Sequence, residues 1–107
     1  CVLPEALPVD KPLSATIRVL ETFSEQVQLQ LQIEVKNLQA DDEISVQLNG
    51  QRVNGWQRVG GGRLQAPIAP ATLRPGPNRV NMQLVQRSPK SKDDRIVGAL
   101  ELHVFQE

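Results

Sequence analysis

The chain has 107 residues, and its 12 Lys and Arg residues balance 12 Asp and Glu residues to a formal net charge of zero. This balance excludes the basic excess typical of nucleic-acid binders and membrane-surface proteins, so no nucleic-acid partner is expected. The length fits one domain with one core. Aromatic residues make up only 3% of the chain, which predicts a mainly aliphatic core.

The first twelve residues contain three of the eight prolines, which remove backbone donors and fix φ. They predict an extended lead-in or linker over 1–12, followed by a single domain over 13–107. Cys1 is the only cysteine, which excludes an intrachain disulfide and a Cys-based metal cluster. It is either the point where a longer protein was cut or the lipid-acceptor residue of a lipoprotein. No apolar run approaches the ~18 residues that a transmembrane helix needs.

Apolar and polar residues alternate most regularly over 27–35, where five aliphatic side chains are separated by three glutamines and a glutamate. A period of two predicts a strand with one dry and one wet face. A helix would need apolar residues three and four positions apart. Less regular alternation predicts further strands at 13–20, 44–48, 51–53, 63–65, 80–84 and 96–104.

Turn signals separate these segments. Asn49-Gly50 suits a two-residue hairpin, in which both central residues take φ > 0. Residues 54–76 form a loop-rich middle, and 87–95 a solvated loop. The last strand is expected to place five residues on one face: Ile96, Gly98, Leu100, Leu102 and Val104. Short strands at regular intervals without a helical period predict an all-β fold, an antiparallel two-sheet β-sandwich.

Patterns for catalysis and metal binding are missing, which predicts a protein that is not an enzyme and has no cofactor. His103 is the only histidine, and no nucleophile-turn motif is present. The adjacent pairs 41–42 and 93–94 are aspartates expected in solvated turns. Calcium is compatible with such oxygens, but no calcium-loop spacing supports it. The glycine run 60–62 lacks the lysine and helix of a phosphate-binding loop.

Candidate ligand-binding residues lie in the loop-rich middle. Trp56 either stacks on a sugar ring and donates its indole N–H, or plugs one end of the core, or packs on an adjacent domain. If a glycan binds, Arg58, Arg63 and Asn54 are the expected hydrogen-bonding partners of its hydroxyls or acid groups.

The zero net charge conceals a polarised sequence. Residues 1–53 carry four Lys and Arg against eight Asp and Glu, whereas residues 54–107 carry eight against four. Six arginines could therefore line one end of the sandwich and attract an anionic group: Arg52, Arg58, Arg63, Arg74, Arg79 and Arg87.

Two motifs resemble the jelly-roll modules of the galactose-binding-like superfamily. A strand ending in Asn49-Gly50 is followed by a turn with Leu73, Pro75-Gly76 and Asn78 before a core strand, and a final strand runs to the terminus. The resemblance covers residues 44–107.

This resemblance implies a jelly-roll module of a larger extracytoplasmic bacterial protein, typically an accessory or C-terminal domain of a glycoside hydrolase. The expected location is extracellular, periplasmic or on the cell surface. Two functions remain open: weak carbohydrate binding, and a structural or protein-interaction module packed on a neighbouring domain of the same polypeptide. The polar stripe of Gln28, Gln30 and Gln32 favours the second.

Overall fold

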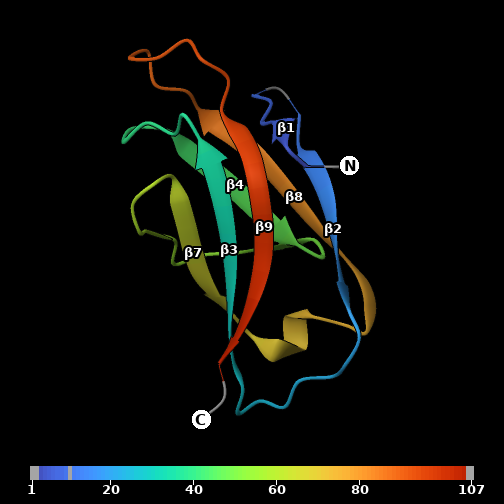
Figure 1. Ribbon diagram of the computed structural model, residues 1–107. Helices are drawn as coiled ribbons and strands as arrows, with labels where there is room; N and C mark the ends of the chain where they lie inside the picture. The colour runs from blue at the N-terminus through green and yellow to red at the C-terminus, as the bar shows by residue number, and fades with distance from the viewer. Residues whose placement is uncertain (1–2, 10, 106–107) are drawn as a thin grey trace.

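The computed structural model describes residues 3–9 and 11–105. It shows two antiparallel sheets packed face to face (Figure 1). The prediction of an all-β, two-sheet sandwich is confirmed, and the arrangement is compatible with a jelly roll. The two interpretations of Cys1 concern a residue outside the described part.

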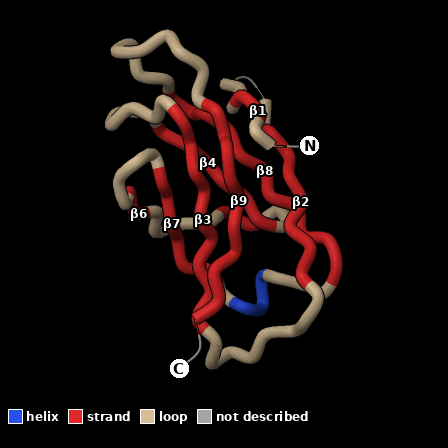
Figure 2. The backbone as a smooth tube through the Cα atoms, in the orientation of Figure 1, coloured by secondary structure: helices blue, strands red, loops and turns tan. Residues whose placement is uncertain are grey.

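The first sheet has the strand order β1-β9-β3-β7-β6. Its strands are β1 Glu5–Ala6, β9 Ile96–Phe105, β3 Gln28–Lys36, β7 Arg63–Ile68 and β6 Gln57–Arg58. The second sheet has the order β2-β8-β4-β5, with β2 Leu13–Val19, β8 Gly76–Gln86, β4 Glu43–Leu48 and β5 Gln51–Arg52. One turn of 3-10 helix, η1 Pro70–Thr72, precedes β8 (Figure 2).

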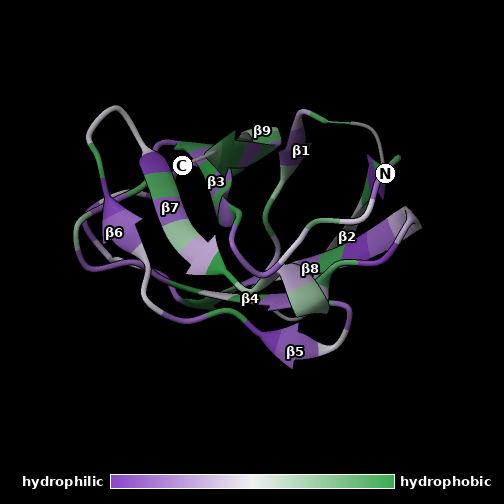
Figure 3. Ribbon diagram, turned by 90° about the horizontal axis from the view of Figure 1, so that it is seen from below, coloured by the Kyte–Doolittle hydropathy of each residue, from purple (hydrophilic) through white to green (hydrophobic). Residues whose placement is uncertain are grey.

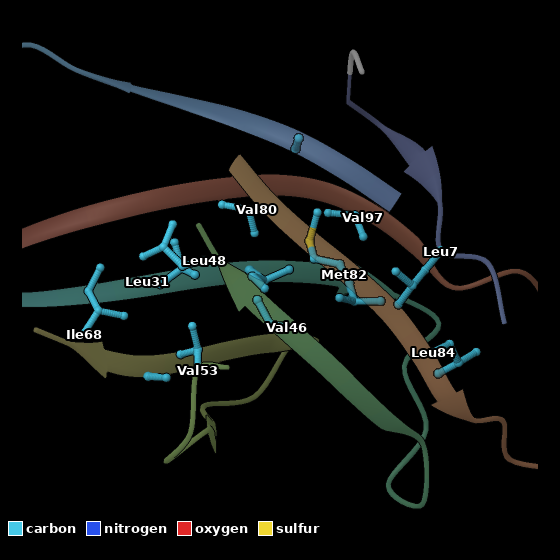
Figure 4. Close-up of a cluster of buried hydrophobic side chains, with 14 of the residues drawn as sticks. Leu7, Leu31, Val46, Leu48, Val53, Ile68, Val80, Met82, Leu84 and Val97 are labelled. Carbon is cyan, nitrogen blue, oxygen red and sulfur yellow. The ribbon is translucent and has the colours of Figure 1, made fainter. Parts of the chain in front are cut away.

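The core lies between the two sheets and is aliphatic, as the composition predicts. Along β3 the four inward side chains are at most 2% exposed and alternate with polar residues on the outer face. They belong to one buried cluster with the inward side chains of β8 and β4, as Figure 4 shows for Leu31, Leu48 and Val80. The members that are at most 1% exposed include Leu31, Ile33, Val35, Val46, Leu48, Val80, Met82, Leu84 and Val97.

Two strands are longer than the sequence predicts because each accommodates a proline. Pro67 lies in β7 and pairs with Gln30 of β3, while the β6–β7 pairing stops at Gln65. Pro77 lies in β8 opposite Arg18 of β2, beyond the last residue that pairs with β4. A proline is tolerated where no neighbouring strand needs its missing N–H.

The last strand does not keep the predicted single face. Its register against β3 shifts between Glu34 and Val35, so that Ala99 and Val97 become consecutive partners and Gly98 is the extra residue. This irregularity turns Val97 into the core, fully buried, and leaves Gly98 exposed. The expectation that Ile96 lies on the same face as Leu100, Leu102 and Val104 is therefore wrong, because a bulge reverses the alternation.

The expected lead-in contributes to the sandwich. β1 pairs with the first residues of β9. Leu7 is 5% exposed, and its N–H donates to the Arg95 carbonyl at 2.7 Å. The Leu84 N–H donates to the Pro8 carbonyl at 3.1 Å. Residues 5–8 thus lie against both sheets.

The two turn motifs meet in space through their asparagines. Asn49 has φ +52° and donates its amide to Asn78 Oδ1 at 2.8 Å. Asn78 is fully buried, and its own amide donates to the carbonyls of Arg74 at 2.8 Å and Gly76 at 3.1 Å. Both motifs are therefore explained by the hydrogen bonds through which the two asparagines join the turns and satisfy their backbone carbonyls.

Candidate functional site

Trp56 lies on the segment that crosses from the second sheet to the first, between β5 and β6 (Figure 3). Its ring is half-buried and packs against the core. The indole N–H donates to the Val53 carbonyl at 3.0 Å. The side chain therefore covers part of the core, and its single donor is engaged within the chain.

Arg58 joins the same region to the turn after β3. Its Nη1 donates to the Gln39 carbonyl at 2.7 Å and its Nη2 to the Asp42 carbonyl at 2.6 Å. Trp56 and Arg58 line one hollow of about 100 Å³, whose remaining walls are Ile44, Val46 and Leu64. Pockets that enclose small molecules usually measure ~300–1,000 Å³. This hollow can therefore admit the edge of a ligand but cannot enclose one.

The other two candidate residues lie elsewhere. Arg63 is on β7, and its Nε is 4.0 Å from Glu34 Oε2, with both side chains more than half exposed. Asn54 lines a separate groove of about 210 Å³ between residues 51–54 and 67–72. The structure thus brings together Trp56 and Arg58, and not the four predicted residues.

The six arginines do not gather at one end of the molecule. Arg74 follows η1, whereas Arg87 begins the loop before β9, and these segments lie at opposite ends of the sandwich (Figure 2). Arg87 donates to the carbonyls of Lys92 and Asp93 in its own loop. The expected single cluster of arginines at one end of the sandwich is therefore wrong.

Polar side chains cover the outer surface of the first sheet, formed by β9, β3 and β7. We call this surface the amide face; its residues are Gln28, Gln30, Gln32, Gln65, Glu101 and His103. Gln30, Gln32 and Gln65 are half-buried, and Gln32 Nε2 donates to Gln65 Oε1 at 3.3 Å. Lateral packing therefore holds these side chains on the surface of the sheet.

On β9, the amide face places one imidazole beside one carboxylate. His103 pairs with Gln30 and Glu101 pairs with Gln32 across the β3–β9 register. His103 Nε2 is 3.9 Å from Glu101 Oε2 and has no hydrogen-bond partner in the described chain. The face consequently offers amides, a carboxylate and an imidazole, and it lies beside the Glu34–Arg63 pair.

A buried ion pair is the feature that the sequence analysis missed. Asp42 and Arg95 are 3% and 1% exposed, although the sequence predicts solvated loops at both positions. Arg95 Nε donates to Asp42 Oδ2 at 2.7 Å and Arg95 Nη2 to Asp42 Oδ1 at 3.0 Å. The backbone N–H groups of Gln39 and Ser88 each donate to one carboxylate oxygen at 2.7 Å.

The remaining guanidinium donors of Arg95 hold its own loop. Nη1 donates to the carbonyls of Ser91 at 3.1 Å and Asp93 at 2.6 Å. Burial of Asp42 raises its pKa, but the hydrogen bonds from Arg95, Gln39 and Ser88 outweigh burial and hold the pKa below its usual value. The pair therefore ties together the β3–β4 turn and the β8–β9 loop, and its donors and acceptors are occupied.

Neither a protein-family model nor a curated protein matches the chain. In the described residues, no group of three or more His, Cys, Asp or Glu side chains is placed to hold a metal ion. No helix in that part of the chain is long and apolar enough to cross a membrane.

Proposed function

We propose that the chain is a non-catalytic accessory module that packs its amide face against a neighbouring domain of the same polypeptide. The supporting observation is that Gln30, Gln32 and Gln65 are half-buried on this face and that Gln32 donates a lateral hydrogen bond to Gln65. Interfaces between domains of one chain are more polar than obligate interfaces. Amides both donate and accept, so they can pair with a partner backbone without the desolvation cost of a charge.

The resemblance to galactose-binding-like jelly rolls supports the wider setting of this proposal. Modules of that kind accompany bacterial glycoside hydrolases and related extracytoplasmic proteins, and we place this chain in the same setting. The two motifs behind the resemblance, at Asn49 and at Asn78, join two turns and need no ligand to account for them. They therefore support a fold assignment, while the amide face supports the function.

Calorimetry tests the packing proposal. The module should unfold several degrees higher within its complete gene product than alone, because docking stabilises only the folded state. Gln32→Glu should remove this difference, because it places a second carboxylate directly opposite Glu101 in the docked face. Gln47→Glu is the matched control, since Gln47 is exposed on β4 in the other sheet. Equal unfolding temperatures in both contexts would contradict the proposal.

Weak carbohydrate binding is the second candidate. The observation that favours it is the common hollow of Trp56 and Arg58, which has an apolar floor and a cationic rim. Affinity would be low, because one ring edge offers little area against the cost of association. Affinity electrophoresis with soluble neutral and acidic polysaccharides tests it. Retardation that Trp56→Ala removes, with the fold checked by circular dichroism, would support binding; no retardation of the unaltered chain would exclude it.

A further inference from the structure

The four edges of the two sheets differ sharply in length. Within residues 3–9 and 11–105, three edges are the two-residue strands β1, β6 and β5. The fourth edge is β2, which has seven residues, no proline and one charged side chain, Arg18. Proteins usually shorten, charge or cover their edges because unpaired backbone groups attract other strands. β2 departs from that pattern.

The contacts of β2 with β8 show which of its backbone N–H and C=O groups point into the sheet and which point away from it. The Asn78 side chain reaches the Ile17 carbonyl at 3.4 Å, and Asn78 is the β8 residue directly opposite Ile17. The Ile17 carbonyl therefore faces β8. Because backbone groups of successive strand residues point to opposite sides, the N–H and C=O of Ser14, Thr16 and Arg18 face away from the sheet. No described residue pairs with this side of β2.

We propose that β2 pairs with β2 of a second copy of this chain, in antiparallel register about a two-fold axis at Thr16. In that register Thr16 lies opposite Thr16, and Ser14 lies opposite Arg18. All these positions carry outward main-chain groups, so each pair can exchange two hydrogen bonds, about six in total. The second sheet of one copy and the second sheet of the other would then form one continuous sheet.

The side chains of β2 are self-complementary in this register. On the core side, Ala15 meets Ile17 and Leu13 meets Val19, so each pair joins a smaller and a larger apolar residue. On the solvent side, Arg18 meets Ser14, whose Oγ is held by Asn81 at 2.6 Å. No like charges face each other. This complementarity favours a second copy over an unlike strand. The proposal concerns the second sheet and is independent of the amide face.

Sedimentation analysis of the whole chain under reducing conditions tests the proposal. The expected result is a concentration-dependent monomer–dimer equilibrium. Thr16→Pro removes an N–H that is free within the monomer, and it should weaken dimerisation roughly tenfold or more, because it deletes two intermolecular bonds. Thr16→Val keeps the backbone and should leave the dimer intact. A chain that stays monomeric at millimolar concentration would overturn the proposal.

A charge exchange tests the register even if the proline variant folds poorly. Ser14→Arg alone should weaken the dimer, because two guanidinium groups then face each other. Adding Arg18→Glu should restore it, and the rescue should diminish with added salt. A dimer that is insensitive to both changes would form through another surface and would overturn the proposed pairing.

Discussion

Replacement of Asp42 by asparagine is the substitution that most severely tests the account of the fold. Each carboxylate oxygen accepts one bond from Arg95 and one from a backbone N–H, of Ser88 at Oδ1 and of Gln39 at Oδ2. The asparagine side chain would have one acceptor oxygen and would turn an NH₂ group toward two donors. It would also leave the buried guanidinium without its counter-ion.

The cost follows from these contacts. Removing one partner of a buried ion pair costs about 3–5 kcal/mol, and loss of two hydrogen bonds to a charged group gives a similar figure. Domains of this size are stable by roughly 5–15 kcal/mol in total. Asp42→Asn should therefore remove a large part of the stability and lower the unfolding temperature by about 15 °C or more.

The effect has a defined pH dependence. The folded-state pKa of Asp42 lies below the ordinary value of 3.8, through hydrogen bonds that outweigh burial. Its contribution to stability is thus complete well above pH 3.8 and is lost as the pH falls from there through the folded-state pKa. The stability difference between the unaltered chain and Asp42→Asn should shrink over that acidic range.

Urea unfolding followed by the fluorescence of Trp56, the only tryptophan, measures both effects. Asp94→Asn is the matched control, because Asp94 is exposed in the same loop as Arg95 and should change stability little. A loss below about 1 kcal/mol on Asp42→Asn, or a difference that does not change with pH, would refute the reasoning that a buried charge pair joins the two loops.

Two further substitutions test the turns by the same urea titration. Asn78→Asp replaces an amide that donates to three carbonyls with a carboxylate, and should cost about 2–4 kcal/mol, whereas Asn54→Asp, at an exposed position, should change little. Gly62→Ala places a Cβ 2.2 Å from the Val35 carbonyl oxygen, while Gly61→Ala meets no atom within 4 Å. Both glycines have positive φ, so both variants should lose about 1 kcal/mol, and Gly62→Ala should lose distinctly more. Equal losses in either pair would contradict these contacts.

Alternation and turn chemistry were sufficient to predict the sandwich. The pattern over 27–35 predicted β3 and its buried face, and Asn49-Gly50 predicted the hairpin between β4 and β5. β7 and β8 were predicted too short because proline was taken to end a strand. Pro67 and Pro77 lie within these strands, at positions where no neighbouring strand needs their missing N–H. The face of β9 was misassigned because one inserted residue at Gly98 reverses a period of two.

The candidate site was predicted less well, since it depends on which loops meet. Asp42 and Arg95 are separated by 53 positions and look like ordinary loop residues in the sequence. Their only local signal is that each lies immediately before the first residue of a strand, β4 or β9, where a side chain can turn inward. The sequence predicted that Arg58 could bind glycan hydroxyls. In the structure its guanidinium instead donates to two carbonyls of its own chain.

Thiol labelling tests the central claim, that the amide face packs on a neighbouring domain, most directly. In a Cys1→Ser background, Gln32→Cys places one thiol on the amide face and Gln47→Cys places one on the other sheet. We expect a maleimide to react at least roughly tenfold more slowly with the first thiol in the complete gene product than in the chain alone, and equally fast with the second in both contexts. Equal reaction of the Gln32→Cys thiol in both contexts would contradict the account.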